Sequence, residues 1–494
     1  MAFHQLSKSS FIKGLQCEKH LYLYKHHYEL MDTLSEIQKA VFSRGTNIGI
    51  LAQKLFPEGI DTSPRDVRQT SKAVEQTDQF IKNGASILYE AAFIYDEVMV
   101  YCDIISLHEG KWQIFEVKSS TGISETYLWD AAVQYYVLRG AGYEIEDISI
   151  VYINNEYVRQ GEVNLDEFFT VESVLADIQS LLPVVQQNVR KFKGVLNRPE
   201  MPDIEIGEYC TNPYRCSFFN YCWKKIPENS VFDISNMHFK KKMELYRDGI
   251  IKLDDIPNDY PLSKNYKIQV DAFKSGESLI NKEAIKEFLE DFEYPLYFMD
   301  FESFQPAIPL YDNSKPYQQI PFQYSVHILT EPDAELKHYE FLADPNEEPR
   351  KPFIEHLLHD LGDHGSIVVY NKSFEIGRLN EIVRDFPEHL EAIERIVERI
   401  VDLMVPFQKK YYYKPEMQGS YSIKYVLPAL LPELSYENME IGDGATASVS
   451  YELLREMDDM FEIEKIRNNL LEYSKLDTYA MVRIYQKLIQ EIDL

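Results

Sequence analysis

The chain has 494 residues, of which 45% are hydrophobic and 27% are charged, and its 80 acidic against 51 basic residues give a net charge of −29. This is a globular composition, and the length is sufficient for two to four domains with cores of their own. The negative charge argues against a protein that holds nucleic acid by bulk electrostatic attraction. It is compatible with an enzyme whose carboxylates bind divalent metal ions.

The N-terminal sequence MAFHQLSKSSFIKGLQ lacks an apolar core of signal-peptide length. No stretch approaches the roughly 18 apolar residues that a bilayer-spanning helix requires. We therefore expect a cytoplasmic protein with no membrane partner.

Apolar periodicity predicts the elements of the first half: a helical region at 18–60, two or three strands with a hairpin at 88–120, a helix at 125–139, a strand at 147–153 and a helix at about 170–193. Pro and Asn turns between short amphipathic helices predict a connector at 225–290. Strands follow at 296–304, 321–329 and 366–371, and helices dominate to the end. We expect an α/β protein with domains at 1–230 and 291–494, joined by a helical connector at 231–290.

Asp103 lies late in one predicted strand, and Glu116 and Lys118 lie in the next strand. Side chains alternate along a strand, so Glu116 and Lys118 share a face on which Asp103 can lie beside them. Two carboxylates that hold Mg²⁺ or Mn²⁺, with a lysine that orients water or offsets transition-state charge, suit metal-assisted phosphodiester hydrolysis. A salt bridge on an exposed strand face is the alternative interpretation.

This segment resembles the PD-(D/E)XK nuclease core of the RecB family, in which a helix, the Asp, the Glu-x-Lys and a helix with a Gln follow in this order. Gln134, in WDAAVQYYVL, stands where the Gln of that family would be. The resemblance implies a restriction-endonuclease-like domain whose active site contains this Gln and the three residues above. That family often has a metal-binding His in the first helix, whereas the nearest position here is Gly49, or Gln53 with a shift.

Four of the five cysteines suggest a metal site. Three fall within thirteen residues and one lies near the N-terminus: Cys210, Cys216, Cys222 and Cys17. Four cysteines can bind a [4Fe–4S] cluster or a structural Zn²⁺, and buried thiols without a metal are the third interpretation. One cysteine before a nuclease core and three after it resembles the iron–sulfur staple of the RecB-like AddB and CRISPR-adaptation nucleases, although the first gap of five residues, rather than two, leaves zinc open.

Acidic residues also recur in the second half of the chain. Asp300 and Glu302 are two apart in the strand LYFMDFESF, and Glu375 follows a buried strand in the first turn of a helix. Tyr473 and Asp477 are four apart on one face of a helix. Three carboxylates from separate elements plus a tyrosine suit two-metal catalysis, in which ions roughly 3.5–4 Å apart stabilise the attacking water and the leaving 3′-oxygen.

The order of these motifs resembles the DEDD exonucleases of RNase H-like fold, in the subtype with Tyr-x3-Asp in its last motif. The Asp-x-Glu pair would form the first motif. Asn371-x2-Phe374-Glu375 would form the second, with Glu where that family normally has Asp. The resemblance implies an RNase H-like 3′-5′ exonuclease domain in which the tyrosine positions the water. Asp402, in IVDLMVPF, is either an accessory polar residue or a helix cap.

Together the two halves resemble an uncharacterised bacterial family that pairs a RecB-like iron–sulfur nuclease domain with a DEDD-type exonuclease domain. The resemblance implies a two-site, metal-dependent nuclease that degrades DNA, at ends or in single strands, in repair or in defence against foreign DNA, and RNA is the alternative substrate. The competing interpretation is a nucleic-acid-binding or scaffold protein with inactive sites. It is supported by Gly49, where the RecB family often has a metal-binding His, and by Glu375, where the exonucleases normally have Asp. Protein partners are not indicated by the sequence.

Overall fold

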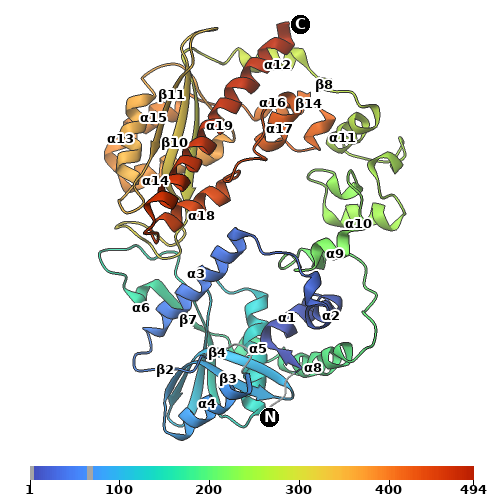
Figure 1. Cartoon of the computed structure of the whole chain (residues 1–494), viewed down its shortest axis with the longest axis vertical. Coiled ribbons are helices and arrows are strands. Elements are labelled where there is room, and N and C mark those ends of the chain that lie inside the picture. The colour runs from blue at the N-terminus through green and yellow to red at the C-terminus, as the bar shows by residue number, and fades with distance from the viewer. Residues whose placement is uncertain (1–4, 64–69, 494) are drawn as a thin grey trace. The chain divides into compact units, whose positions relative to one another are not determined.

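The computed structural model describes residues 5–63 and 70–493 (Figure 1). The chain forms two compact units: unit 1 comprises Met1–Lys225 with Ala307–Tyr317, and unit 2 comprises Ile226–Pro306 with Gln318–Leu494. Both units mix helices and strands, as expected for an α/β chain. The expected connector is not a separate unit, because its residues belong to unit 2.

Unit 1 contains one sheet, built from β1 (Leu6–Ser7), β2 (Ile60–Asp61), β3 (Ile87–Tyr95), β4 (Val98–His108), β5 (Lys111–Val117), β6 (Ile145–Ile153) and β7 (Phe169–Ser173). The order is β2-β3-β4-β5-β6-β7, and β1 pairs with β4. β3, β4 and β5 are antiparallel, whereas β5 and β6 are parallel. Glu109 and Gly110 turn the predicted hairpin with positive φ angles, as a tight turn between twisted strands requires.

The helices of unit 1 are α1 (Lys8–Gln16), α2 (Glu18–His26), α3 (Glu36–Gln53), α4 (Thr70–Lys82), α5 (Glu125–Gly140), α6 (Leu165–Phe168), α7 (Leu175–Ile178), α8 (Leu182–Leu196) and α9 (Phe219–Trp223). Helices α1, α5 and α8 share one core with the sheet, through Phe11, Val133 and Val189. Helix α3 packs through Ile48 and Ala52 in a second core, with other residues of the same strands. The sheet therefore has helices on both faces.

Unit 2 contains a second sheet, built from β9 (Leu296–Phe304), β10 (Ile320–Leu329), β11 (Lys337–Leu342), β12 (Ile367–Val369) and β13 (Ile400–Asp402). Its order is β11-β10-β9-β12-β13. The pairs β11–β10 and β10–β9 are antiparallel, and the pairs β9–β12 and β12–β13 are parallel. A short pair joins β8 (Leu279–Ile280) to β14 (Tyr412–Tyr413).

The helices of unit 2 are α10 (Phe239–Arg247), α11 (Lys264–Ser275), α12 (Lys282–Leu289), α13 (Arg350–Asp360), α14 (Lys372–Asp385), α15 (Leu390–Glu398), α16 (Val405–Gln408), α17 (Ile423–Leu430), α18 (Gly444–Leu454) and α19 (Met460–Asp493). None of the helices in the described ranges is both long enough and apolar enough to cross a membrane.

The two faces of β9 have different partners. Met299 and Phe301 belong to the core that contains α13, α14 and α15. Because side chains alternate along a strand, Asp300 and Glu302 point to the opposite face, where α19 lies along β9 and β10 (Figure 1). Both faces of the strand are thus buried, and Asp300 and Glu302 interrupt the otherwise apolar face that α19 covers.

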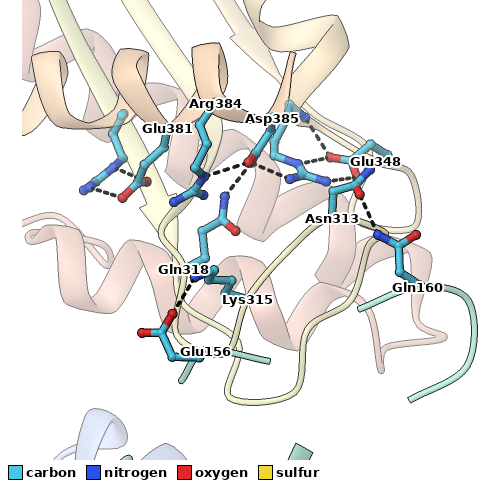
Figure 2. A network of polar contacts seen from close by, with 11 residues as sticks. Glu156, Gln160, Asn313, Lys315, Gln318, Glu348, Glu381, Arg384 and Asp385 are labelled. Atoms are coloured by element: carbon cyan, nitrogen blue, oxygen red, sulfur yellow. Dashed lines mark hydrogen bonds and ion pairs between the residues drawn. The ribbon is translucent and has the colours of Figure 1, made fainter. Parts of the chain in front are cut away.

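The segment between β9 and β10 has different partners along its length. Lys315 Nζ lies 3.0 Å from Glu156 Oε2, and Gln160 Nε2 donates to Asn313 Oδ1 at 2.7 Å, which are contacts within unit 1 (Figure 2). The chain re-enters unit 2 at Gln318, whose Nε2 donates to Asp385 Oδ2 at 2.6 Å. The strand that carries Asp300 is therefore followed by a segment that is part of the other unit's structure.

Candidate functional site

All five acidic and tyrosine residues singled out in the second half of the chain line one cavity of unit 2, with a volume of about 220 Å³: Asp300, Glu302, Glu375, Tyr473 and Asp477. They come from β9, from the first turn of α14 and from α19. Carboxylate oxygens of Asp300, Glu302 and Asp477 lie within 4.8 Å of one another, as in no other group of potential metal ligands in the described ranges. The structure thus brings the predicted residues together.

The cavity concentrates negative charge away from water. Burial raises the pKa of Asp300, Glu302 and Glu375 well above their ordinary values, and neighbouring carboxylates add to the rise. Burial also raises the pKa of Asp477 to about 6, although two tyrosine hydroxyls that donate hydrogen bonds to it act in the opposite direction. Glu375 Oε2 is buried and has no hydrogen-bond partner in the described part of the chain. Carboxylates in such surroundings favour a bound cation.

Two residues beside these carboxylates were not predicted. Tyr436 Oη donates to Asp477 Oδ1 at 2.6 Å. Lys424 Nζ lies 5.7 Å from the centre of the Tyr473 ring and lowers the pKa of Glu302 against the larger effect of burial. Lys424 lies in the segment GSYSIKYVL, whose mixture of lysine and tyrosine could have marked it as a candidate site residue. Nothing in the sequence around Tyr436 indicates that its partner is Asp477.

Asp402 caps backbone amides and does not line the cavity, although its charge adds to the rise in the pKa of Glu375. Its Oδ1 accepts hydrogen bonds at 3.0 Å from the backbone N–H groups of Asn371 and Met404, and its Oδ2 accepts one at 3.1 Å from Lys372. The bonds from Asn371 and Lys372 satisfy amides at the start of α14, which carries Glu375, and the bond from Met404 satisfies an amide just before α16. The cap interpretation of Asp402 is therefore the one that agrees with the geometry.

Unit 1 brings its own predicted residues together. Lys118 Nζ donates to Glu116 Oε1 at 2.8 Å, and Gln134 Nε2, from α5, donates to Glu116 Oε2. Asp103, on β4, accepts a hydrogen bond at 2.7 Å from the backbone N–H of Val117, between the two predicted residues of the next strand. Both oxygens of Glu116 are thus held by side-chain donors.

Two further charged residues complete this site. Lys8, the first residue of α1, places its Nζ 2.5 Å from Glu116 Oε1, and Lys118 Nζ also lies 2.6 Å from Asp130 Oδ2. Asp130 precedes Gln134 by four residues on α5, so helical spacing could have identified it. Lys8 is 108 residues from its partner, and no local pattern points to that contact.

The two carboxylates of the unit 1 site have opposite electrostatic surroundings. Burial raises the pKa of Asp103 to about 7, and the charge of Glu116 adds to the rise. Burial alone would also raise the pKa of Glu116, but Lys118 and Lys8 outweigh burial and lower that pKa to about 2. The two lysines therefore keep Glu116 ionised. At Asp103, burial and the charge of Glu116 outweigh the effect of the same lysines, and the pKa remains raised.

The first-helix position of the RecB family holds no histidine in this chain. Gly49, on α3, has no side chain, and apart from its chain neighbours and the backbone of its own helix no heavy atom of the described residues lies within 4 Å of the point where its Cβ would be. Gln53 is the last residue of α3, and its carbonyl oxygen accepts a hydrogen bond from the Tyr89 hydroxyl at 3.2 Å.

The four clustered cysteines line one cavity of unit 1: Cys17, Cys210, Cys216 and Cys222. All are free thiols, and no three of their sulfur atoms lie within 4.8 Å of one another. Burial raises the pKa of Cys17 and raises that of Cys216 to about 12, so these thiols are protonated without a metal. The fifth cysteine, Cys102, is fully buried in the core of the sheet.

Comparison with known proteins gives matches of unknown function. Residues 297–422 match a domain of unknown function, DUF2779. The uncharacterised protein UU173 of Ureaplasma parvum is 28% identical over 271 residues, which are 48% of this chain and 39% of that protein. The uncharacterised MG366 homologue of Mycoplasma pneumoniae is 29% identical over 211 residues, which are 39% of this chain and 32% of that protein. The chain thus spans less than half the length of the curated relatives it matches.

Proposed function

We propose that the protein is a metal-dependent nuclease with two active sites, a 3′-5′ exonuclease in unit 2 and a RecB-like nuclease in unit 1. The observation that carries the proposal is the carboxylate group of Asp300, Glu302 and Asp477, whose oxygens lie within 4.8 Å of one another in a cavity. Hydrolysis of a phosphodiester with divalent ions requires such a group of carboxylates from separate elements.

The topology of each unit supports the finer assignment. In unit 2, the first strand of the mixed five-stranded sheet lies at its centre and carries Asp300 and Glu302, as we expect of an RNase H-like exonuclease. In unit 1, the antiparallel strands β3 to β5, helix α5 and the parallel strand β6 follow one another in the order of a PD-(D/E)XK core.

Mg²⁺ or Mn²⁺ fits the unit 2 cavity, because four carboxylates line it and one of them has a buried oxygen without a partner in the described ranges. Asp300, Glu302, Glu375 and Asp477 would hold two such ions, which would supply charge stabilisation for the attacking water and the leaving 3′-oxygen. Tyr436 fixes the orientation of Asp477 through its hydrogen bond. We expect the hydroxyl of Tyr473 to position the attacking water, and the ammonium of Lys424 to offset part of the negative charge.

In the unit 1 site, Asp103 and Glu116 are the proposed metal ligands. Their oxygens are the type that Mg²⁺ and Mn²⁺ prefer, and the raised pKa of Asp103 indicates a carboxylate that gains from a nearby cation. Gln134 holds Glu116 in place through its amide. The Lys118 ammonium is the group that would orient water or offset charge on the phosphorane.

We propose a structural [4Fe–4S] cluster for the four cysteines, with Zn²⁺ as the alternative. Four thiolates around one zinc ion at about 2.3 Å would lie about 3.8 Å apart. No three of the sulfur atoms are within 4.8 Å of one another, which favours the larger cluster. Either metal would join Cys17 to a segment about 190 residues later and so restrict the unfolded chain.

The proposed substrate is DNA, at ends or in single strands, and the proposed role is repair or defence against foreign DNA. The test is the release of nucleotides from 3′-labelled single-stranded DNA and RNA, in Mn²⁺ or in EDTA. Wild type should trim DNA only with the metal, and Asp300→Asn should slow trimming by roughly two orders of magnitude or more.

The control for this experiment is Asp333→Asn. Asp333 is exposed in a turn of the same unit and has a positive φ angle, which Asn adopts readily. The activity of the Asp333→Asn variant should therefore equal that of wild type. Full trimming by Asp300→Asn, or no metal-dependent trimming of DNA by wild type, would show that the exonuclease assignment is wrong. Trimming of RNA alone would replace the proposed substrate.

A further inference from the structure

Lys8 and Lys118 both contact the same carboxylate oxygen in the unit 1 site. Lys8 Nζ lies 2.5 Å and Lys118 Nζ 2.8 Å from Glu116 Oε1. Side chains of the two lysines are 21% and 17% exposed, against 2% for Glu116, so the contacts are largely removed from water. Two ammonium groups on one buried oxygen supply a local charge comparable to that of a divalent ion.

The carboxylates around the two lysines outnumber them, so the site has a negative net charge that a cation could balance. Four carboxylates interact electrostatically with the two lysines: Glu90, Asp103, Glu116 and Asp130. When all four carboxylates are ionised, two ammonium groups leave two negative charges, which one divalent ion neutralises; such an ion also favours the ionised forms of Asp103 and Glu90, whose pKa values are raised without it. The unit 2 cavity differs, because none of its four carboxylates forms an ion pair with a lysine or arginine of the described chain.

The position of Lys8 is fixed by its surroundings and not by its own contact alone. Strand β1 pairs with β4 through Leu6 and Ser7, immediately before Lys8. The Ser7 hydroxyl caps α1 by accepting the N–H of Ser10. The helix ends at Gln16, and the next residue is Cys17. Lys8 and a ligand of the cysteine cluster therefore stand at opposite ends of one short helix.

We propose that the ammonium of Lys8, together with that of Lys118, takes the place of a second divalent cation in the unit 1 site, so that this site binds one metal ion. This inference rests on the proposed nuclease function of unit 1. Lys8 is a positioning residue, because it acts on the substrate through Glu116 and through the charge of the site. Unit 1 is then a one-ion nuclease, in contrast to the two-ion site of unit 2.

The test counts Mn²⁺ ions bound to the full chain, from the loss of the free Mn²⁺ signal in electron paramagnetic resonance. All proteins carry Asp300→Asn and Asp477→Asn, which remove the unit 2 group. This background should bind about one ion, and Lys8→Ala in it should bind about two, because the vacated position becomes available to a cation. Lys8→Arg should restore about one ion, because it restores the charge.

Lys111→Ala is the matched control, because Lys111 is exposed on the strand that carries Glu116. It should bind the same number of ions as the background. Two ions in the background, or an unchanged number in Lys8→Ala with intact circular dichroism, would overturn the inference about Lys8. Cleavage of DNA by the same background tests the proposed function separately: if Lys118→Ala leaves that cleavage unchanged, the nuclease assignment of unit 1 fails, whatever the ion count.

Discussion

Two aspartates of unit 2 show how the partners of a residue decide its role. Asp402 accepts hydrogen bonds from three backbone amides, whereas Asp477 lies within 4.8 Å of two other carboxylates. Removing a carboxylate that satisfies backbone donors leaves those donors unpaired, but removing one member of a crowded acidic group relieves repulsion. The same residue type therefore stabilises the fold at one position and opposes it at the other.

We expect Asp402→Ala to lower the free energy of unfolding of unit 2 by about 1–3 kcal/mol, because three backbone amides lose their acceptor. Chemical denaturation of the metal-free protein measures this change. Asp477→Asn should instead leave the metal-free protein as stable as wild type or more so. A larger loss of stability in Asp477→Asn than in Asp402→Ala would contradict these roles.

The acidic cavity also predicts a pH dependence. Burial raises the pKa of Asp300 well above its ordinary 3.8 and that of Asp477 to about 6, so the folded metal-free protein binds protons at these groups that the unfolded chain releases. The contribution of these groups to the free energy of unfolding therefore falls as the pH rises from 3.8 through 6 and above.

Differential scanning calorimetry in EDTA should show this fall. Between about pH 5 and about pH 8, the melting temperature of wild type should decrease by more than that of Asp300→Asn/Asp477→Asn. Excess Mn²⁺ should reduce the difference, because a bound cation replaces the protons. Identical pH dependence of the two proteins would rule out a cost of ionising these groups.

Local spacing predicted the residues of the sites that lie on one element or on adjacent strands. Asp300 and Glu302 share a face because they are two apart in a strand, and Tyr473 and Asp477 share one because they are four apart in a helix. Lys8 and Tyr436 were not predicted, because their partners are distant in the sequence and only the tertiary fold brings them close.

Helix α1 connects the cysteine cavity to the unit 1 site, since Lys8 begins the helix and Cys17 follows its last residue. Loss of a metal held by Cys17 should therefore loosen the helix and displace Lys8, although Cys17 is distant from the chemistry. We expect Cys17→Ser to lose the proposed cluster and to reduce Lys118-dependent cleavage, while Asp300-dependent trimming persists.

Elemental analysis and the two cleavage assays measure these effects. Wild type should contain about four iron atoms per chain, whereas one zinc atom and no iron would indicate a structural zinc site in place of the cluster. Cys102→Ala is the control, because Cys102 is buried outside the cysteine cavity and should leave the metal in place. Iron retained at full occupancy in Cys17→Ser would exclude Cys17 as a ligand.

At the scale of elements, strong patterns were reliable and weak ones were not. The alternating residues of 88–120 form β3, β4 and β5. The helix expected at 170–193 is instead β7, α7 and α8, because FTVES pairs with β6 as an edge strand and Pro183 favours a helix start near Leu182. Pairing with a neighbouring strand overrides a periodicity that is compatible with a helix.

The division of the whole molecule was only partly predictable. Turn-rich composition suggested a connector at 231–290, but Val231, Leu245 and Val270 form a hydrophobic core that belongs to unit 2. The segment 307–317 belongs to unit 1, although it follows β9 of unit 2. Neither result follows from local composition, because each depends on which distant residues a segment packs against.

The measurement that tests the central claim most directly is cleavage of end-labelled DNA by four proteins: wild type, Lys118→Ala, Asp300→Ala and the double variant, each in Mn²⁺ and in EDTA. If the two sites act independently, each single variant should lose a different set of products. The double variant in Mn²⁺ should then resemble wild type in EDTA. A double variant that cleaves DNA as well as wild type would contradict both sites.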